Sequence, residues 1–186
     1  MSELAGSSGQ RKAPLLPSAL AQLCRSLPPT IRGLRDQALL LAGWAAAQRR
    51  SELVTLHLAD VLLTSSGLRL PIRQSKTDTA GTGQEVVILR RSQPTCAVAA
   101  LEAWLARRGD APGPLFVPVP RGGHLVYGRL SDKAEVRALK AAIRDARDYA
   151  AHSLRAGLVT TAHLQGASLH QIAAHTRHRS LESLRD

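Results

Sequence analysis

Three short stretches of the sequence carry side chains that suit the chemistry of a phosphate ester. They are QRRSEL at 48–53, SKTD at 75–78 and HSLR at 152–155. Two guanidiniums can each bind non-bridging phosphate oxygens and stabilise the charge that builds in the transition state. A lysine can protonate a leaving alkoxide, a histidine can relay a proton, and a carboxylate can orient a neighbouring arginine. The combination suits holding and breaking a phosphodiester without a metal.

Together with the final RHRS segment, these stretches supply the candidate site residues Arg49, Glu52, Lys76, His152, Arg155 and His178. Each also has an ordinary structural interpretation. Arg49 and Glu52 could form a surface pair at a helix end, Lys76 could be a solvated charge at a hairpin tip, and His152 and Arg155 could lie at a helix start. We favour the functional interpretation. Lysine is rare among the 25 basic residues, yet one stands in SKTD, where a titratable ammonium would matter.

Four histidines near the end of the chain raise the question of a metal site. They are His163, His170, His175 and His178. Their spacing does not bring all four rings to one place, and no cysteine or carboxylate lies among them to complete a site. We predict no metal and no cofactor.

The charge of the chain favours a polyanionic partner. The 25 basic residues outnumber 14 acidic ones, which gives a formal net charge of +11 over 186 residues. A GC-rich genome would explain arginine in place of lysine, but it would not explain this excess of bases. We therefore expect double-stranded DNA as the partner.

The composition favours helices. Apolar residues make up 44% of the chain but aromatic residues only 3%, so the core must consist of Leu, Val, Ile and Ala. No apolar run is long enough to span a membrane, and the first residues lack the hydrophobic stretch of a signal peptide. Cys24 and Cys96 are expected to be buried thiols of a cytoplasmic protein, with a disulfide as the less favoured interpretation.

The pattern along the chain predicts a mainly α fold with a small antiparallel β-sheet (α+β). We expect a short helix at 18–27 with Ser18 near its cap, and a single long buried helix at 34–56. About three strands should follow between 61 and 90, with Pro71 on an edge strand.

The second half of the chain reads as further helices. Pro94 should open one that Gly109 closes, and Ser131 should cap another. The next helix should run from about 153 to 165 and end at Gly166. Ser168 and Gln171 then form a capping box for another helix, and a last helix should start at Ser180. Trp44 and Trp104 read as core residues.

The blocks RRSEL, SKTD, HSLRAG and HRSLESLR resemble, in this order, those of the tyrosine recombinases, or phage-integrase-type site-specific recombinases. The resemblance runs from about Leu15 to Asp186. It implies the tyrosine-recombinase (integrase) catalytic-domain fold.

The resemblance also implies a role for each candidate residue. Arg49 takes the place of the first catalytic arginine and Glu52 that of its acidic neighbour. Lys76 matches the lysine between the second and third strands, and His152 and Arg155 match the H-x-x-R pair. His178 falls where the family has its His or Trp. These are the candidates already named, and Arg177 stands where the family usually has glycine.

The reaction implied by the resemblance is DNA cleavage and rejoining through a 3′-phosphotyrosyl intermediate. The family's nucleophilic tyrosine would fall one position beyond Asp186, and neither Tyr127 nor Tyr149 replaces it by position. We therefore expect the chain as given to bind DNA without forming the covalent link. A non-catalytic DNA-binding remnant or regulator is the alternative. A type IB topoisomerase and a helix-turn-helix regulator are less favoured.

For domain organisation we expect a flexible leader at 1–13 and a catalytic domain at 14–186, without the family's N-terminal helical module. The resemblance implies a tetramer on DNA for the intact protein, and we expect a monomer for this fragment.

Overall fold

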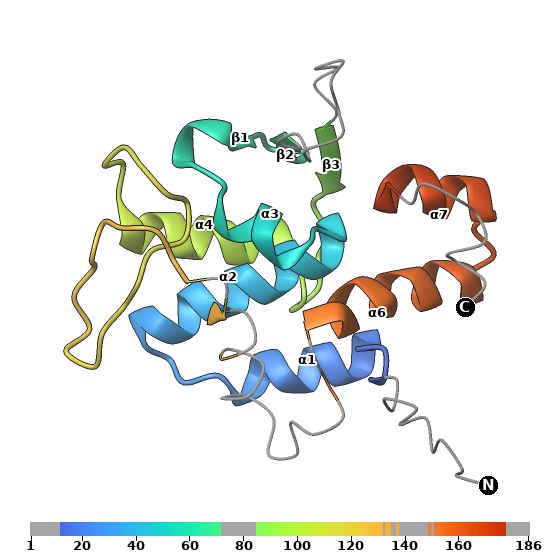
Figure 1. Ribbon diagram of the computed structural model, residues 1–186, viewed down its shortest axis with the longest axis horizontal. Helices are drawn as coiled ribbons and strands as arrows, with labels where there is room; N and C mark the ends of the chain where they lie inside the picture. Colours follow the sequence, from blue (N-terminus) through green and yellow to red (C-terminus); the bar gives the residue numbers. More distant parts are fainter. Residues whose placement is uncertain are drawn as a thin grey trace, which may run out of the picture.

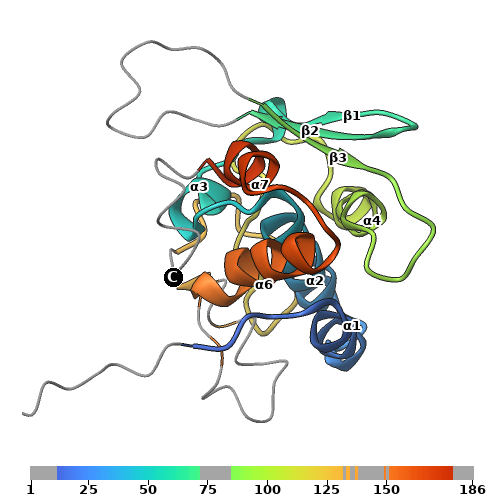
Figure 2. The ribbon, with the colours of Figure 1, turned by 90° about the vertical axis from the view of Figure 1, so that its right-hand side faces the viewer.

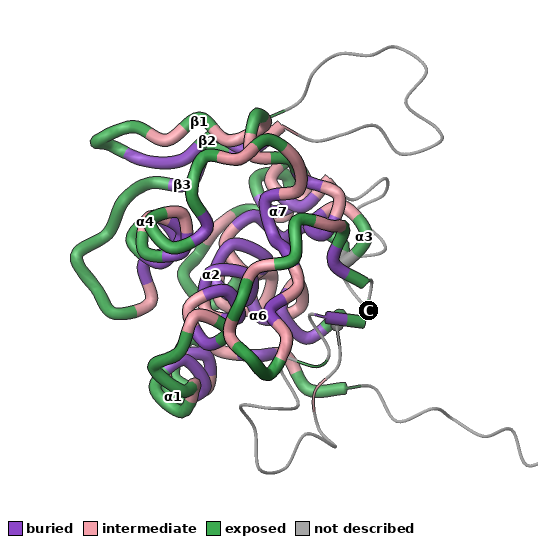
Figure 3. The backbone as a smooth tube through the Cα atoms, turned by 90° about the vertical axis from the view of Figure 1, so that its left-hand side faces the viewer, coloured by how far each residue is buried: buried purple, intermediate pink, exposed green. Residues whose placement is uncertain are grey.

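A long central helix organises the fold. Figure 1 shows the computed structural model, which describes residues 12–71, 85–131 and 151–177, together with 133, 134, 137 and 149. The central helix is α2 (Ile31–Ala46), and Thr30 caps it by accepting a hydrogen bond from the Gly33 N–H at 3.2 Å. It packs against α4 (Ala97–Arg108) and α6 (Ala151–Leu164). Figure 3 shows most of α2 buried, as a helix that is apolar on nearly every face must be.

The first helix, α1 (Pro17–Ser26), lies beside α6 and starts earlier than the sequence indicates. Its N-cap is Leu16 and Pro17 occupies the first turn, where the missing proline N–H costs nothing. The N-cap therefore lies two residues before Ser18.

The segment before α1 is fixed to α6 and to the central helix. The Leu15 N–H donates to the Ser153 carbonyl at 2.8 Å, and the Trp44 Nε1–H donates to the Leu15 carbonyl at 2.9 Å. Gly157 permits this approach, because a Cβ there would lie 2.0 Å from the Leu15 oxygen. These contacts hold the part of α6 that carries Arg155.

The prediction of a single long helix at 34–56 is wrong, because the helix ends at Ala46. Ala47 adopts a left-handed conformation (φ 46°, ψ 33°), and a short helix, α3 (Arg50–Val54), follows. Alanine is a strong helix former, so local preference does not cause the break. The Ala47 carbonyl instead accepts hydrogen bonds from two distant arginines.

The small sheet confirms the prediction of three antiparallel strands. After a 3-10 turn (Leu58–Asp60) come β1 (Leu62–Leu63), β2 (Gly67–Pro71) and β3 (Glu85–Leu89), in the order β1-β2-β3. Leu68, Leu70, Val86 and Ile88 face the core. Pro71 was predicted on an edge strand but ends the central strand, where it pairs with Glu85. The SKTD block lies outside the described residues.

The fourth helix, α4, anchors the connection that follows it. It begins at Ala97, three residues after Pro94, with Cys96 as N-cap, and Gly109 closes it with φ 75°. The Trp104 Nε1–H donates to the Leu115 carbonyl at 2.9 Å. Trp104 is fully buried, as predicted, whereas Trp44 is only partly buried. Both cysteines are free and buried.

The last described helices match their predicted boundaries closely. Gly166, with φ 83°, follows α6, and α7 (Leu169–Thr176) begins with the predicted capping box of Ser168 and Gln171. Most of the helix predicted after Ser131 and all of the helix predicted from Ser180 lie outside the described residues. Among the helices that are described, none is long and apolar enough to cross a membrane. The mainly α fold with a small antiparallel sheet is confirmed.

Candidate active site

Arg49 and Glu52 lie at the start of α3, directly after the break in the long helix. The Arg49 backbone N–H donates to Glu52 Oε2 at 2.9 Å, and Arg49 Nη1 donates to Oε1 at 2.8 Å. The Arg49 side chain is 48% exposed, whereas Glu52 is only 13% exposed. The carboxylate thus caps a helix and orients a half-exposed guanidinium.

Arg155 reaches the same place from α6. Its Nη1 donates to the Ala47 carbonyl at 2.6 Å, and its Nη2 donates to the Thr176 carbonyl. These carbonyls end α2 and α7, where unpaired oxygens and the helix dipole favour a cation. Burial, with the charges of Arg49 and Arg177, lowers the pKa of Arg155 to about 10. Arg155 is therefore a charged guanidinium at neutral pH.

Arg177 is a third guanidinium of this cluster. It follows α7 in a left-handed conformation (φ 59°). Its Nη2 donates to Glu52 Oε2 at 3.0 Å and to the Ala47 carbonyl at 3.2 Å. Burial lowers the pKa of Arg177, and the charge of Glu52 opposes that shift. The sequence marks Arg177 only as a replacement for glycine. Its contacts cross about 125 positions of chain, so no local signal predicts them.

The structure therefore brings three candidates, Arg49, Glu52 and Arg155, into one cluster. Figure 2 shows α3 and α7 next to each other with α6 beneath them. His152 is exposed on the first turn of α6, one helical turn before Arg155. Lys76 and His178 lie outside the described residues. We call Arg49, Glu52, Arg155 and Arg177 the arginine cluster.

The arginine cluster has more positive than negative charge. It holds three guanidiniums and one carboxylate, that of Glu52, which accepts hydrogen bonds from Arg49 and Arg177. Both hydrogen-bond acceptors of Arg155 are neutral carbonyls. An anion that binds here would supply the missing negative charge, and a phosphate matches the geometry of a guanidinium.

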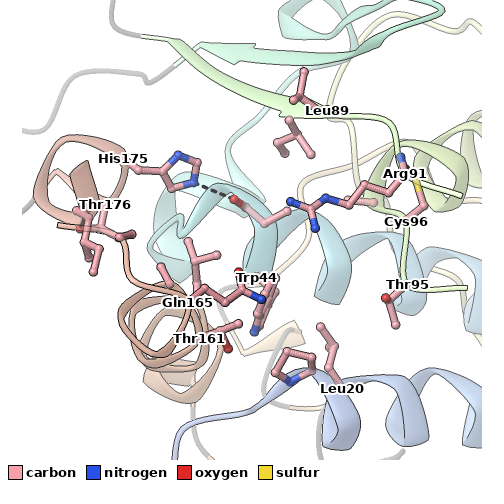
Figure 4. A pocket seen from close by; sticks show the side chains of 18 of the residues that line it. Leu20, Trp44, Leu89, Arg91, Thr95, Cys96, Thr161, Gln165, His175 and Thr176 are labelled. Atoms are coloured by element: carbon pink, nitrogen blue, oxygen red, sulfur yellow. Dashed lines mark hydrogen bonds between the residues drawn. The ribbon is translucent and has the colours of Figure 1, made fainter. Parts of the chain in front are cut away.

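A separate apolar pocket of about 530 Å³ lies on the other side of α7. It is lined by residues of α1, α2, β3, α6 and α7, including Leu20, Trp44 and Leu89 (Figure 4). His175 faces this pocket, and its Nε2–H donates to the Ala45 carbonyl at 2.8 Å. None of the described candidate residues lines the pocket. His175 thus docks α7 on α2 and does not join the arginine cluster.

Comparison with known proteins gives one strong sequence relative. The chain is 35% identical over 181 residues to an integrase/recombinase XerD homolog from Selenomonas ruminantium, a match that covers 94% of this chain. The chain belongs to the tyrosine recombinase family. The chain spans about half the length of that relative, because the match covers 53% of it.

Solved structures of recombinases share the fold of this tyrosine recombinase chain. The XerA recombinase matches with a TM-score of 0.69 at 20% identity, covering 97% of this chain and 60% of XerA. XerH bound to its difH substrate in a pre-cleavage complex matches with a TM-score of 0.67 at 18% identity, covering 94% of this chain and 50% of XerH. No protein-family model matches the chain. The catalytic-domain fold implied by the resemblance is confirmed.

Proposed function

We propose that this chain is the catalytic part of a site-specific recombinase, and that Arg49 and Arg155 hold the DNA phosphate at which the strand is cut. The observation that supports this most directly is the arginine cluster. Guanidiniums from α3 and α6, separated by about a hundred positions of sequence, lie around one carboxylate and one carbonyl.

Each residue has a role that its surroundings support. Two of the five N–H donors of Arg155 bind carbonyls, which fixes the plane of its guanidinium. Arg49 is half exposed and oriented by Glu52, so it can bind a second phosphate oxygen. Together they would stabilise the charge of the pentacoordinate transition state. His152 is exposed one turn away and is proposed to relay a proton.

The proposed partner is double-stranded DNA. The formal net charge of +11 suits a polyanion, and one structural neighbour is a recombinase bound to a DNA substrate. In the proposed reaction a tyrosine oxygen bonds to phosphorus while the bond to the 5′ oxygen breaks. The tyrosine proton passes to a base, and the leaving oxygen takes a proton from Lys76 or His178. A 5′ hydroxyl of the partner duplex then reverses these steps.

The test of this function is covalent trapping. The family resemblance implies an attacking tyrosine directly after Asp186, so the experiment uses a version of the chain that continues with a tyrosine at that position. Duplexes that bind the protein are first selected from a random pool and then nicked near the bound site. Loss of the short fragment beyond the nick would trap the 3′-phosphotyrosyl adduct.

The expected result is an adduct that Arg155→Gln abolishes and that Arg107→Gln leaves unchanged. Arg107 is an exposed arginine at the end of α4, so its substitution removes the same charge away from the cluster. DNA binding without any adduct would favour a non-catalytic DNA-binding protein. An adduct of equal yield with Arg155→Gln would contradict the proposed role of the cluster.

A further inference from the structure

Arg177 adopts a backbone conformation that arginine seldom adopts. Its φ of 59° lies in the left-handed region, and Ala47 is the other non-glycine residue with positive φ in the described part of the chain. A side chain at such a position crowds the following carbonyl, which glycine would avoid. The turn that ends α7 would therefore form more easily with glycine at 177. The arginine side chain must contribute something that glycine lacks.

The side chain of Arg177 turns back to the junction of α2 and α3. Its Nη2 donates both to Glu52 Oε2 at 3.0 Å and to the Ala47 carbonyl at 3.2 Å. The Arg177 side chain is only 10% exposed. One nitrogen thus joins the end of α2, the carboxylate in α3 and the end of α7.

Glu52 is consequently shared between two arginines. Oε1 accepts from Arg49 Nη1, and Oε2 accepts from the Arg49 backbone N–H and from Arg177 Nη2. Removal of Arg177 would leave Oε2 with one of its two donors. The carboxylate could then rotate, and the guanidinium of Arg49 would rotate with it.

The rest of the Arg177 guanidinium is buried at a cost. Its Nε and Nη1 atoms are buried and have no hydrogen-bond partner among the described residues. Buried donors without acceptors destabilise the folded state. Residues kept under such strain tend to mark functional sites. Both the backbone and the side chain of Arg177 therefore argue against a purely structural role.

We propose that Arg177 is a positioning residue that holds Glu52 and, through Glu52, fixes the direction of the Arg49 guanidinium. The use of Arg49 on a DNA phosphate rests on the proposed function, but the Arg177–Glu52–Arg49 link does not. Arg177 would then act on the phosphate through Arg49, since its own unpaired donors are shielded from solvent.

Two substitutions at Arg177 distinguish a role in positioning Arg49 from a role in forming the turn after α7. Arg177→Gly relieves the left-handed backbone and removes the side chain, whereas Arg177→Gln removes the charge and keeps the backbone crowded. If Arg177 were needed only for the turn, Arg177→Gly would leave the orientation of the Arg49 guanidinium and the affinity for DNA as in the wild type. If Arg177 is a positioning residue, both variants disturb the Arg49 guanidinium and weaken DNA binding to the same extent. Arg107→Gln is the charge-matched control.

The first measurement is nitrogen–proton NMR of the arginine side chains in the free protein. Arg177→Gly and Arg177→Gln should both shift or broaden the Nε–H signal of Arg49, and Arg107→Gln should leave it in place. An Arg49 signal that is unchanged in both Arg177 variants would overturn the proposal. This measurement needs no DNA, so it decides the link even if the proposed function fails.

The second measurement is a double-mutant cycle on the affinity for a selected duplex. The Arg177→Gln substitution should weaken binding to the duplex about tenfold when Arg49 is present. It should have almost no effect on binding when Arg49 is already replaced by Gln. Equal losses in both backgrounds would mean that Arg177 acts independently of Arg49, which overturns the proposal. A wild-type protein that binds no duplex would refute the proposed function alone, and the NMR result would still decide the link.

Discussion

Arg155 shows why a guanidinium is needed at this point of the structure. Its two Nη atoms donate to the carbonyls of Ala47 and Thr176, which end two different helices. A lysine ammonium is a single point of charge and cannot span both oxygens with fixed geometry. Arg155 therefore joins α2, α6 and α7, and the same contacts orient it for an anion. Its structural and its proposed functional roles cannot be separated by charge alone.

The two cysteines allow a residue-scale test of the local electrostatics. Burial raises the pKa of Cys24 to about 11. Burial would also raise the pKa of Cys96, but backbone N–H groups of Ala99, Arg91 and Val98 and the charge of Arg90 outweigh it, so the pKa is lowered. Cys96 also lines the apolar pocket, where its sulfur is visible in Figure 4.

We predict that the alkylation of Cys96 by iodoacetamide begins to rise at a lower pH than that of Cys24 in the native protein, because the thiolate is the reactive form and Cys96 has the lower pKa. As pH rises, Cys96 should reach its maximal rate first, since its pKa is the lower. Mass spectrometry of alkylated peptides between pH 7 and 10 measures both rates. Rates that rise with pH in parallel for the two cysteines would contradict the assigned environments.

At the scale of elements, the sequence predicted those features that depend only on neighbouring residues, such as helix ends and the alternation of a strand. The capping box of Ser168 and Gln171, Gly109 and Gly166 at helix ends, and the alternation of Leu68 with Leu70 were all readable in the sequence. Each depends on residues within a few positions. Apart from the end of α2 and the separate helix α3, the described helices and the sheet were therefore predictable to within a few residues.

The break at Ala47 was not predictable, because its cause is remote. Arg155 and Arg177 bind the Ala47 carbonyl from 108 and 130 positions away. The segment around the break consists of good helix formers, so the local preference is to continue. The break nevertheless decides the site, because it places Arg49 at the N-cap of a new helix. The sequence blocks identified Arg49 as a candidate, but they did not show which contacts orient its side chain.

Gly157 provides an element-scale test of how α6 is positioned. A Cβ at this position would lie 2.0 Å from the Leu15 carbonyl oxygen and 2.9 Å from Trp44 Nε1. Gly157→Ala should therefore separate the Leu15 segment from α6 and lower the free energy of unfolding by about 1–3 kcal/mol. Chemical denaturation measures this difference.

Gly43→Ala is the matched control within a helix. Its Cβ would meet only side-chain atoms of Leu53 and Leu154, at 3.0 and 3.5 Å. Alanine also favours a helix by about 1 kcal/mol over glycine. We expect Gly43→Ala to change stability much less than Gly157→Ala. A Gly157→Ala protein as stable as the wild type would show that Leu15 does not pack against α6 in this way.

At the scale of the whole molecule, the excess positive charge in the arginine cluster predicts stabilisation by anions. Binding of an anion to the folded state alone raises the melting temperature. Sulfate or inorganic phosphate at about ten times its dissociation constant should raise it by about 3 °C above chloride at equal ionic strength. Differential scanning fluorimetry measures the shift.

Sulfate also stabilises proteins without a specific site, so the variant decides the outcome. Arg155→Gln should lose most of the extra shift, and Arg107→Gln should keep it. If the anion raises the melting temperature of the wild type and of Arg155→Gln equally, the arginine cluster does not bind the anion.

The family of the chain was predictable from four short blocks, because all four occur together and in the order that the family has. The convergence of Arg49, Glu52 and Arg155 agrees with that prediction. Lys76 and His178 lie outside the described residues, and their roles stay predictions. Arg177 shows the limit of the blocks, since a residue that departs from the family pattern takes its meaning from contacts across the fold.

The most direct test of the account is whether Arg49 and Arg155 act on the same phosphate. A selected duplex is made with one neutral methylphosphonate at each successive position, and affinities are measured for the wild type, Arg49→Gln and Arg155→Gln. The account predicts one position at which the neutral group weakens the wild type about tenfold and at which neither variant loses further affinity. If the two variants become insensitive at different positions, or at none, the two guanidiniums do not share a phosphate and the account is wrong.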